Sequence, residues 1–203
     1  MEIDNLDYSK NWWKMAKEIN LIPAPNGFIC PDDPGEPGLK IPRWSVNEIE
    51  ARIVSEFCRG LRVLEIGTGL GISTKEIARR AKWVYTVDID PWVKENIAPS
   101  LPDNVLFYDN IKKIRAVNFD AAFIDGLHNY SQCTQDIEDA RRLVKRDGLF
   151  IFHDAKMDPI RGAVHNAGLQ ATYIATAAGL VIAWNGGQNG RHDQDADREG
   201  GGD

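Results

Sequence analysis

The chain has 203 residues, of which 43% are hydrophobic, and this suits one domain of ordinary size with a sizeable core. Its formal net charge of −6 argues against a broad nucleic-acid-binding face, because neutralising phosphates requires clustered Lys and Arg. The chain has neither a run of 18 apolar residues nor the basic start and apolar stretch of a signal peptide, so we expect a cytoplasmic protein. Its three cysteines are widely spaced, which predicts neither a disulfide framework nor a zinc motif.

The first 44 residues are the least regular part of the chain. Apolar residues at helical spacing predict a helix over residues 9–19, and Pro23 and Pro25 are expected to end it. Residues 30–42 contain four prolines and two glycines, which predicts a loop. Because a loop of this length is uncommon in a compact domain unless it is functional or mobile, we interpret residues 1–44 as a cap over a substrate pocket.

Residues 45–184 are predicted to form one α/β domain, because strand patterns and helix patterns alternate along it. Ser45 is expected to cap the first helix, with Glu48 completing a capping box. The expected strands are residues 62–66, 83–87, 105–108, 119–124, 149–152, 171–176 and 180–184. The expected helices that follow them are residues 72–81, 91–97, 131–146 and 159–167. This order predicts a mostly parallel sheet covered on both faces, and the three-residue link between the last two strands predicts an antiparallel pair.

The last segment, residues 185–203, has a different composition from the rest. It holds six of the 18 glycines and no large apolar residue. Its five acidic residues and two arginines give it a charge of −3, which is half of the net charge. Such a segment cannot bury enough apolar surface to offset the entropy of ordering, so we expect a disordered, acidic, glycine-rich tail.

The first strand of the domain leads into a glycine-rich loop, with the sequence VLEIGTGLG at residues 63–71. Gly67, Gly69 and Gly71 allow positive φ angles and a close approach of the backbone to a ligand, although a tight packing turn is the alternative interpretation. The start of the following helix offers free N–H groups to an anion. The G-x-G-x-G spacing differs from the dinucleotide-binding G-x-G-x-x-G, which disfavours an NAD-dependent dehydrogenase. Glu65, which precedes the first glycine, could meet a cationic group.

Acidic residues also follow the second and third strands. Asp88 lies 17 residues after Gly71, which is close to the spacing at which an acid accepts hydrogen bonds from ribose hydroxyls. Asp90 is better placed to cap the helix that follows. Asp109 could accept a hydrogen bond from an adenine amino group, or it could form a turn with Asn110.

The ordered series VLEIGTGLG, then VDID, then an acid after the third strand resembles the class I S-adenosylmethionine-dependent methyltransferases over residues 61–184. The resemblance implies a Rossmann-like, doubly wound α/β fold with seven mostly parallel strands and an antiparallel last strand. It also implies that Glu65 and the glycines hold the methionine part of S-adenosylmethionine, that Asp88 holds the ribose and that Asp109 holds the adenine. The cofactor-binding residues that it implies are Glu65, Gly67, Thr68, Gly69, Gly71, Asp88, Ile89, Asp109 and Asp125.

The fourth and fifth strand ends carry residues suited to the chemistry. Asp125 and His128 follow the fourth strand, while His153 and Asp154 follow the fifth, so neighbouring strand ends would bring all four around one cleft. Carboxylate oxygens suit Mg²⁺, and a hydroxyl bound to a metal ion has a lowered pKa. A nearby histidine can then take the proton, and the resulting alkoxide or phenoxide attacks the methyl group.

The segments IDGLHNY and FHDA, at residues 124–130 and 152–155, resemble small-molecule O-methyltransferases of the macrocin type and cephalosporin-hydroxylase-like proteins. The resemblance implies that Asp125 and Asp154 bind metal, that His128 is the general base, and that His153 is a third ligand or an orienting residue. The expected catalytic residues are therefore His128 and Asp125, and the expected metal ligands are Asp125, His153 and Asp154. Ala155 departs from the catechol-type relatives, which place Asn after the second metal-binding Asp.

These patterns predict an enzyme that uses S-adenosylmethionine and Mg²⁺ to methylate a hydroxyl group of a small molecule such as a sugar or a phenol. We expect no nucleic-acid partner and no membrane, and a homodimer is compatible with the sequence. The alternative is a catalytically inactive cofactor-binding protein of the same fold, which the short chain and Ala155 motivate.

Overall fold

A computed structural model of the protein describes residues 22–24, 27–29, 46–115 and 117–184. The predicted helix at residues 9–19, the predicted loop at residues 30–42 and the predicted tail at residues 185–203 lie outside the described residues. Among the helices that are described, none is both long enough and apolar enough to cross a membrane.

Strands and helices alternate along the described chain, as the sequence predicts. The strands are β1 (Ile22–Ala24), β2 (Gly27–Ile29), β3 (Arg62–Ile66), β4 (Trp83–Val87), β5 (Val105–Tyr108), β6 (Phe119–Ile124), β7 (Val144–Phe152), β8 (Gln170–Ala175) and β9 (Leu180–Trp184). The α-helices are α2 (Glu48–Phe57), α3 (Ile72–Ala78), α4 (Pro91–Asn96), α5 (Tyr130–Arg141) and α6 (Asp158–Asn166). Two 3₁₀ turns, η2 (Ala98–Ser100) and η3 (Ile111–Lys113), flank β5.

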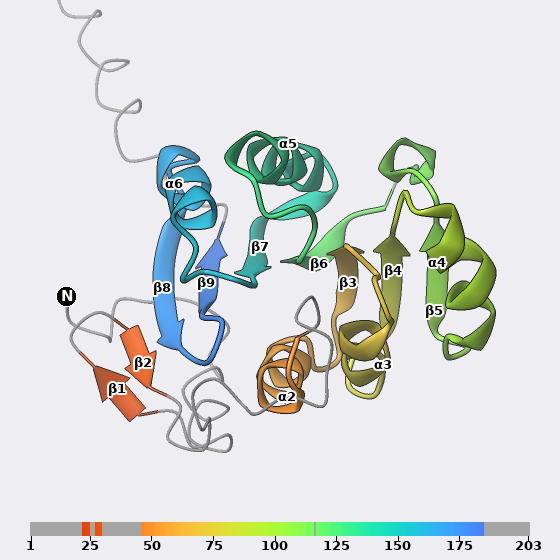
Figure 1. The fold of residues 1–203 in the computed structure, drawn as a ribbon, viewed down its shortest axis with the longest axis horizontal. Helices are drawn as coiled ribbons and strands as arrows, with labels where there is room; N and C mark the ends of the chain where they lie inside the picture. The colour runs from red at the N-terminus through yellow and green to blue at the C-terminus, as the bar shows by residue number, and fades with distance from the viewer. Residues whose placement is uncertain (1–21, 25–26, 30–45, 116, 185–203) are drawn as a thin grey trace, which may run out of the picture.

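All the strands belong to one sheet in the order β1-β2-β8-β9-β7-β6-β3-β4-β5 (Figure 1). The five strands from β7 to β5 in this order are parallel neighbours, and β9 runs antiparallel between β7 and β8. The seven strands from β8 to β5 confirm the predicted Rossmann-like sheet with its antiparallel strand. The pair β1 and β2 extends this sheet beyond β8.

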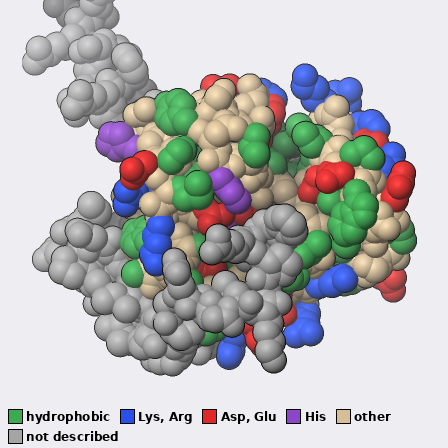
Figure 2. All heavy atoms as spheres, viewed as in Figure 1, with side chains coloured by type: hydrophobic (Ala, Val, Ile, Leu, Met, Phe, Trp, Pro, Cys, Tyr) green, Lys and Arg blue, Asp and Glu red, His purple; other side chains and the backbone are tan. Residues whose placement is uncertain are grey.

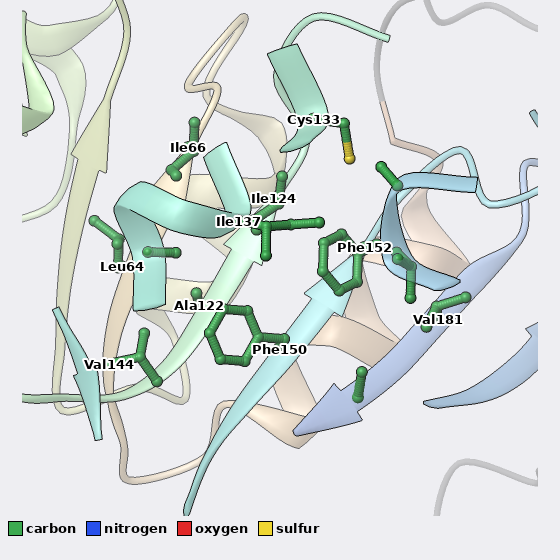
Figure 3. Packing of buried hydrophobic residues seen from close by; sticks show 14 of the residues in the cluster. Leu64, Ile66, Ala122, Ile124, Cys133, Ile137, Val144, Phe150, Phe152 and Val181 are labelled. Carbon is green, nitrogen blue, oxygen red and sulfur yellow. The ribbon is translucent and has the colours of Figure 1, made fainter. Parts of the chain in front are cut away.

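The helices cover both faces of the sheet. Figure 1 shows α5 and α6 on one face and α2 and α3 on the other. Because successive residues of a strand point to opposite faces, each central strand contributes to two cores. Val63 packs with residues of α2 and α3, while its neighbour Leu64 packs with residues of α5 and α6. In the second core, Ile137 of α5 points toward two phenylalanines of β7 (Figure 3).

Residues 22–24 form an edge strand that the sequence does not predict, and an edge strand tolerates the proline that it contains. Two sequence-based expectations about local structure are wrong. The helix expected over residues 131–146 ends at Arg141, and Val144 already belongs to β7. Val144 lies at helical spacing from the apolar residues of α5 in the sequence, and it is buried in the same core as they are, although it belongs to a strand. The cap of α2 is Asn47 and not Ser45, with Glu50 completing the capping box.

A buried carboxylate fixes the start of α3 on the sheet. Glu65 of β3 is fully buried, and its oxygens accept hydrogen bonds from Ser73 Oγ at 2.7 Å and Thr74 Oγ1 at 2.6 Å. Burial raises the pKa of Glu65 to about 7, although these hydroxyl groups act in the opposite direction. Glu65 therefore joins β3 to α3 beneath the glycine loop.

Glu65 is predicted to make the stability of the protein depend on pH. Its pKa rises on folding from 4.5 to about 7, so the folded protein holds more protons than the unfolded chain within this window. The free energy of unfolding should therefore fall as the pH rises through the window, and this contribution should be roughly 1–3 kcal/mol. Urea unfolding of Glu65→Gln at about pH 5 and about pH 8 should show that the contribution is absent.

The matched control for this prediction is Glu95→Gln, which changes an exposed glutamate of α4. Its unfolding free energy should follow the wild-type pH profile. The prediction is contradicted if the profile of Glu65→Gln is also parallel to that of the wild type.

Candidate active site

The glycine loop has the backbone conformation that the sequence predicts. Gly67, Gly69 and Gly71 have φ angles of 97°, 50° and 73°, a region that favours glycine. Gly67 also leaves no room for a side chain, since a β-carbon there would lie 2.2 Å from the backbone oxygen of Asp125. The loop therefore lies directly against the end of β6.

Asp88, which follows β4, binds the backbone of the glycine loop through its carboxylate. Its Oδ2 atom accepts hydrogen bonds from the backbone N–H of Thr68 at 3.1 Å and of Gly69 at 2.9 Å. Its Oδ1 atom accepts one from the N–H of Asp90 at 2.9 Å. A carboxylate offers about four acceptor positions, so Asp88 keeps one for a ligand. Asp90 caps α4, as expected, by accepting a hydrogen bond from Trp92 N.

Two further residues expected to bind the cofactor differ in their surroundings. Ile89, which follows Asp88, is 84% exposed. The carboxylate of Asp109 pairs with Lys94, whose Nζ lies 2.9 Å from Oδ2, and with Lys113. Hydrogen bonds from Lys113 and Lys94 lower the pKa of Asp109 to about 2. An adenine contact by Asp109 stays a prediction and would have to share the carboxylate with these ammonium groups.

Glu65 lies beneath the loop and not at its surface. Both of its oxygens accept hydrogen bonds from hydroxyl groups of α3, as described above. A contact between Glu65 and a cationic ligand group stays a prediction, and the ligand would have to share these oxygens with Ser73 and Thr74.

The ends of β6 and β7 bring Asp125, His128 and Asp154 together. His128 Nε2 lies 2.9 Å from Asp154 Oδ2 and 3.5 Å from Asp125 Oδ1. One nitrogen or oxygen atom from each of the three residues lies within 4.8 Å of the others. On the face of the molecule that is turned to the viewer, Figure 2 shows a histidine beside acidic side chains near the centre, with hydrophobic side chains next to them. The predicted convergence at these two strand ends is therefore present.

His153 lies behind this cluster. Its ring is buried, and Nδ1 lies 3.0 Å from Asp125 Oδ1 and 3.1 Å from Asp154 Oδ2. Its Nε2 lies 3.0 Å from Oε2 of Glu50 on α2. Because ionised carboxylates only accept hydrogen bonds, both ring nitrogens must carry a proton to satisfy this arrangement. With both nitrogens donating, the geometry favours the orienting role of His153 over the expected role as a metal ligand.

The charges of the cluster compensate one another. Contacts with Asp125 and Asp154 raise the pKa of His128 to about 9. Burial alone would lower the pKa of His153, but the surrounding carboxylates raise it well above the usual value. Burial alone would raise the pKa of Asp154, but both histidines hold it below the usual value. Asp154 is therefore ionised at neutral pH and paired with imidazolium groups.

The cluster is compatible with a divalent cation. One nitrogen or oxygen atom from each of Asp125, His128 and Asp154 lies within 4.8 Å of the others, so a metal ion could be held among them. The oxygens of the two carboxylates are the ligand type that Mg²⁺ prefers. His128 Nε2 is also buried and makes no hydrogen bond of normal geometry with the described residues. Ala155 is buried and adds no side-chain ligand, so water or substrate would complete the coordination shell.

Glu50 is a residue of the site that the sequence does not reveal. It is 1% exposed, and it reaches His153 from a helix that lies 103 residues earlier in the chain. The only local signal at this position is the capping box of α2. Tyr130, in contrast, contacts α6, where its hydroxyl accepts a hydrogen bond from Asn166 Nδ2 at 2.9 Å.

Comparisons with known proteins agree with this architecture. A family model described as a methyltransferase domain matches residues 64–155. A curated protein from Pyrobaculum islandicum, named "Probable ribosomal RNA small subunit methyltransferase A", is 32% identical over 69 residues, which are 32% of this chain and 29% of that protein.

Two solved structures share the fold at low sequence identity. The cofactor-bound protein Rv0187 from MTB has a TM-score of 0.61 and 23% identity, over 72% of this chain and 84% of that chain. The O-methyltransferase TomG from Streptomyces achromogenes, in complex with SAM, has a TM-score of 0.60 and 17% identity, over 71% and 82% of the two chains. The strand order and these two structures agree on a Rossmann-like methyltransferase fold, and residues 64–155 of that fold match the methyltransferase domain model.

Proposed function

We propose that the protein transfers a methyl group from S-adenosylmethionine to a hydroxyl group of a small molecule, with the assistance of a divalent cation such as Mg²⁺. The observation that carries the proposal is the contact between Gly67 and the backbone of Asp125. This contact joins the loop suited to the cofactor to the cluster suited to the acceptor. Methyl transfer requires such a junction, because the two reacting atoms must be held close together and in line.

Each polar residue of the junction has a role in this proposal. Asp125 and Asp154 would hold the cation, which when bound acts as a Lewis acid and lowers the pKa of an acceptor hydroxyl. His128 would take the hydroxyl proton on Nε2, the ring atom that faces both carboxylates. With a cation held by the two carboxylates, the imidazolium of His128 would be less favoured, and its proton would pass to solvent water before the ring could act as the base. His153 would orient the two carboxylates from behind.

Two observations support a small acceptor with a hydroxyl group. TomG, whose fold is similar, is an O-methyltransferase. The net charge of −6 disfavours an RNA substrate, although the curated relative that matches 69 residues carries the name of an rRNA methyltransferase. A sugar or a phenol is therefore the acceptor class that we propose.

The first prediction from this proposal concerns the cofactor. Isothermal titration should show that the wild type binds S-adenosylmethionine and S-adenosylhomocysteine with micromolar affinity. Asp88→Ala should weaken both by at least about 10-fold, since it removes a hydrogen-bond acceptor for the ligand and the hydrogen bonds that hold Thr68 and Gly69 of the glycine loop. Asp103→Ala, which changes an exposed aspartate before β5, should leave both affinities unchanged. A folded wild-type protein that binds neither compound would exclude the proposed function.

The second prediction concerns the chemistry. With a panel of hydroxylated sugars and phenols, methylated product should form with Mg²⁺ and should not form with EDTA. Asp154→Asn should lower the rate at least about 100-fold, because a neutral amide is a poor ligand for the cation. The matched control is Asp158→Asn, whose side chain is 87% exposed and should be dispensable.

Three results would revise the chemical part of the proposal. Equal product with Mg²⁺ and with EDTA would remove the cation. Binding of S-adenosylmethionine without product from any acceptor would favour the inactive cofactor-binding alternative. Loss of Mg²⁺ affinity in His128→Ala would make His128 a ligand and not the base.

A further inference from the structure

The side chain of Glu50 joins three segments that are distant in the sequence. It belongs to α2, it faces His153 at the end of β7, and its Oε1 atom accepts a hydrogen bond from the N–H of Ala178 at 2.8 Å. Ala178 lies between β8 and β9. Glu50 is 1% exposed, so these contacts form away from bulk water.

A buried carboxylate needs partners that compensate for its lost hydration. Glu50 has a charged partner in His153 and a neutral partner in the backbone of Ala178. Burial alone would raise the pKa of Glu50, but the hydrogen bond and the charge of His153 lower it. Glu50 is therefore an ionised acceptor, and its negative charge is directed at Nε2 of the imidazole.

The other side of the same ring faces the reactive cluster. Nε2 faces Glu50 Oε2 at 3.0 Å, and Nδ1 on the opposite side of the ring faces Asp125 Oδ1 and Asp154 Oδ2 at 3.0 and 3.1 Å, so the ring bridges Glu50 to the two carboxylates. A charge-assisted hydrogen bond is shorter and roughly twice as strong as a neutral one. The orientation of the ring thus determines where the two carboxylate oxygens lie.

We infer that Glu50 is a positioning residue: it holds the His153 ring in place, and through this ring it sets the carboxylates of Asp125 and Asp154. This inference names a residue for the site in the proposed function and rests on that function for its effect on catalysis. Glu50 touches neither the cluster of Asp125, His128 and Asp154 nor the glycine loop through any hydrogen bond among the described residues. Its side chain meets the residues of the cluster through the His153 ring.

Two substitutions at Glu50 separate positioning from packing. Glu50→Gln keeps the shape of the side chain. Its amide oxygen can still accept from Ala178 N, while its amide N–H can donate to Nε2 if the ring loses that proton. The ring then stays in place with Nδ1–H still directed at the carboxylates. Glu50→Leu fills a similar volume but offers no acceptor, so the ring loses its anchor.

The matched control is Glu56→Gln on the same helix. Glu56 is also buried, at 5% exposure, but it pairs with Arg59 and Arg80 on the far side from the cluster. Its replacement should change the stability of α2 without changing the site.

The first measurement uses the protein without metal or cofactor. Proton–nitrogen NMR spectra should show two ring N–H signals of His153 that are protected from exchange in the wild type, assigned by their loss in His153→Phe. Glu50→Gln should keep only the Nδ1–H signal, Glu50→Leu should lose both, and Glu56→Gln should keep both. Two protected signals in Glu50→Leu, or none in the wild type, would overturn the inference.

The second measurement uses Mn²⁺ as the probe, followed by titration, together with methyl transfer at saturating S-adenosylmethionine. Glu50→Leu should bind Mn²⁺ at least about 10-fold more weakly and lower kcat by a similar factor, with cofactor affinity within about twofold of the wild type. Glu50→Gln should recover both to within about threefold. Wild-type Mn²⁺ affinity in folded Glu50→Leu would contradict the inference. If the wild type itself binds no Mn²⁺, the metal-assisted part of the proposed function fails, and the NMR result alone decides the role of Glu50.

Discussion

The contact between the ends of β3 and β6 is the constraint on which the rest of the site depends. In the strand order, β4 and β5 follow on one side of this contact and β7 follows on the other, so the winding direction of the sheet reverses there. Open α/β sheets bind ligands at such a switch point. Gly67 and Asp125 approach each other so closely that no β-carbon fits between them. A larger residue at position 67 would move the glycine loop away from the carboxylates, and the two halves of the proposed reaction would no longer meet.

The cations near the carboxylates differ between Asp109 and the cluster of Asp125, His128 and Asp154 that we propose as the reaction site. Asp109 is paired with two lysines, and a lysine ammonium keeps its charge at neutral pH. Asp125 and Asp154 are paired with imidazoles, whose ordinary pKa is about 6.5. An imidazolium favours an ionised carboxylate beside it, and it can release its proton near neutral pH, which a lysine ammonium does not. The imidazolium charge in the cluster could therefore be replaced by that of a bound cation, whereas the ammonium groups of Lys94 and Lys113 would stay charged beside Asp109.

The sequence predicts those parts of the site that are encoded locally. Strand periodicity, the glycine spacing and the acids after each strand are visible within a few residues, and parallel neighbours then bring Asp125 and Asp154 together. Contacts between distant segments leave no such pattern. Glu50 has only a capping-box signal, and its partner His153 is 103 residues away. The sequence pattern extends α5 beyond its observed end at Arg141. An apolar residue such as Val144 fits a helix as well as a strand that faces the same core, so the pattern does not distinguish the two.

The backbone at Asp154 explains how the cluster keeps its shape. Among the described residues it is the one non-glycine residue with a positive φ, at 53°. Such a conformation persists only where the surroundings determine it. Here the next residue, Ala155, is buried and donates its N–H to Gly179 O at 3.0 Å, so the chain is tied to the turn between β8 and β9. Glu50 holds the same turn through Ala178. The backbone and the His153 ring together fix the direction of the Asp154 carboxylate, and a ligand would meet an acceptor that is already in place, with little cost of reorganisation.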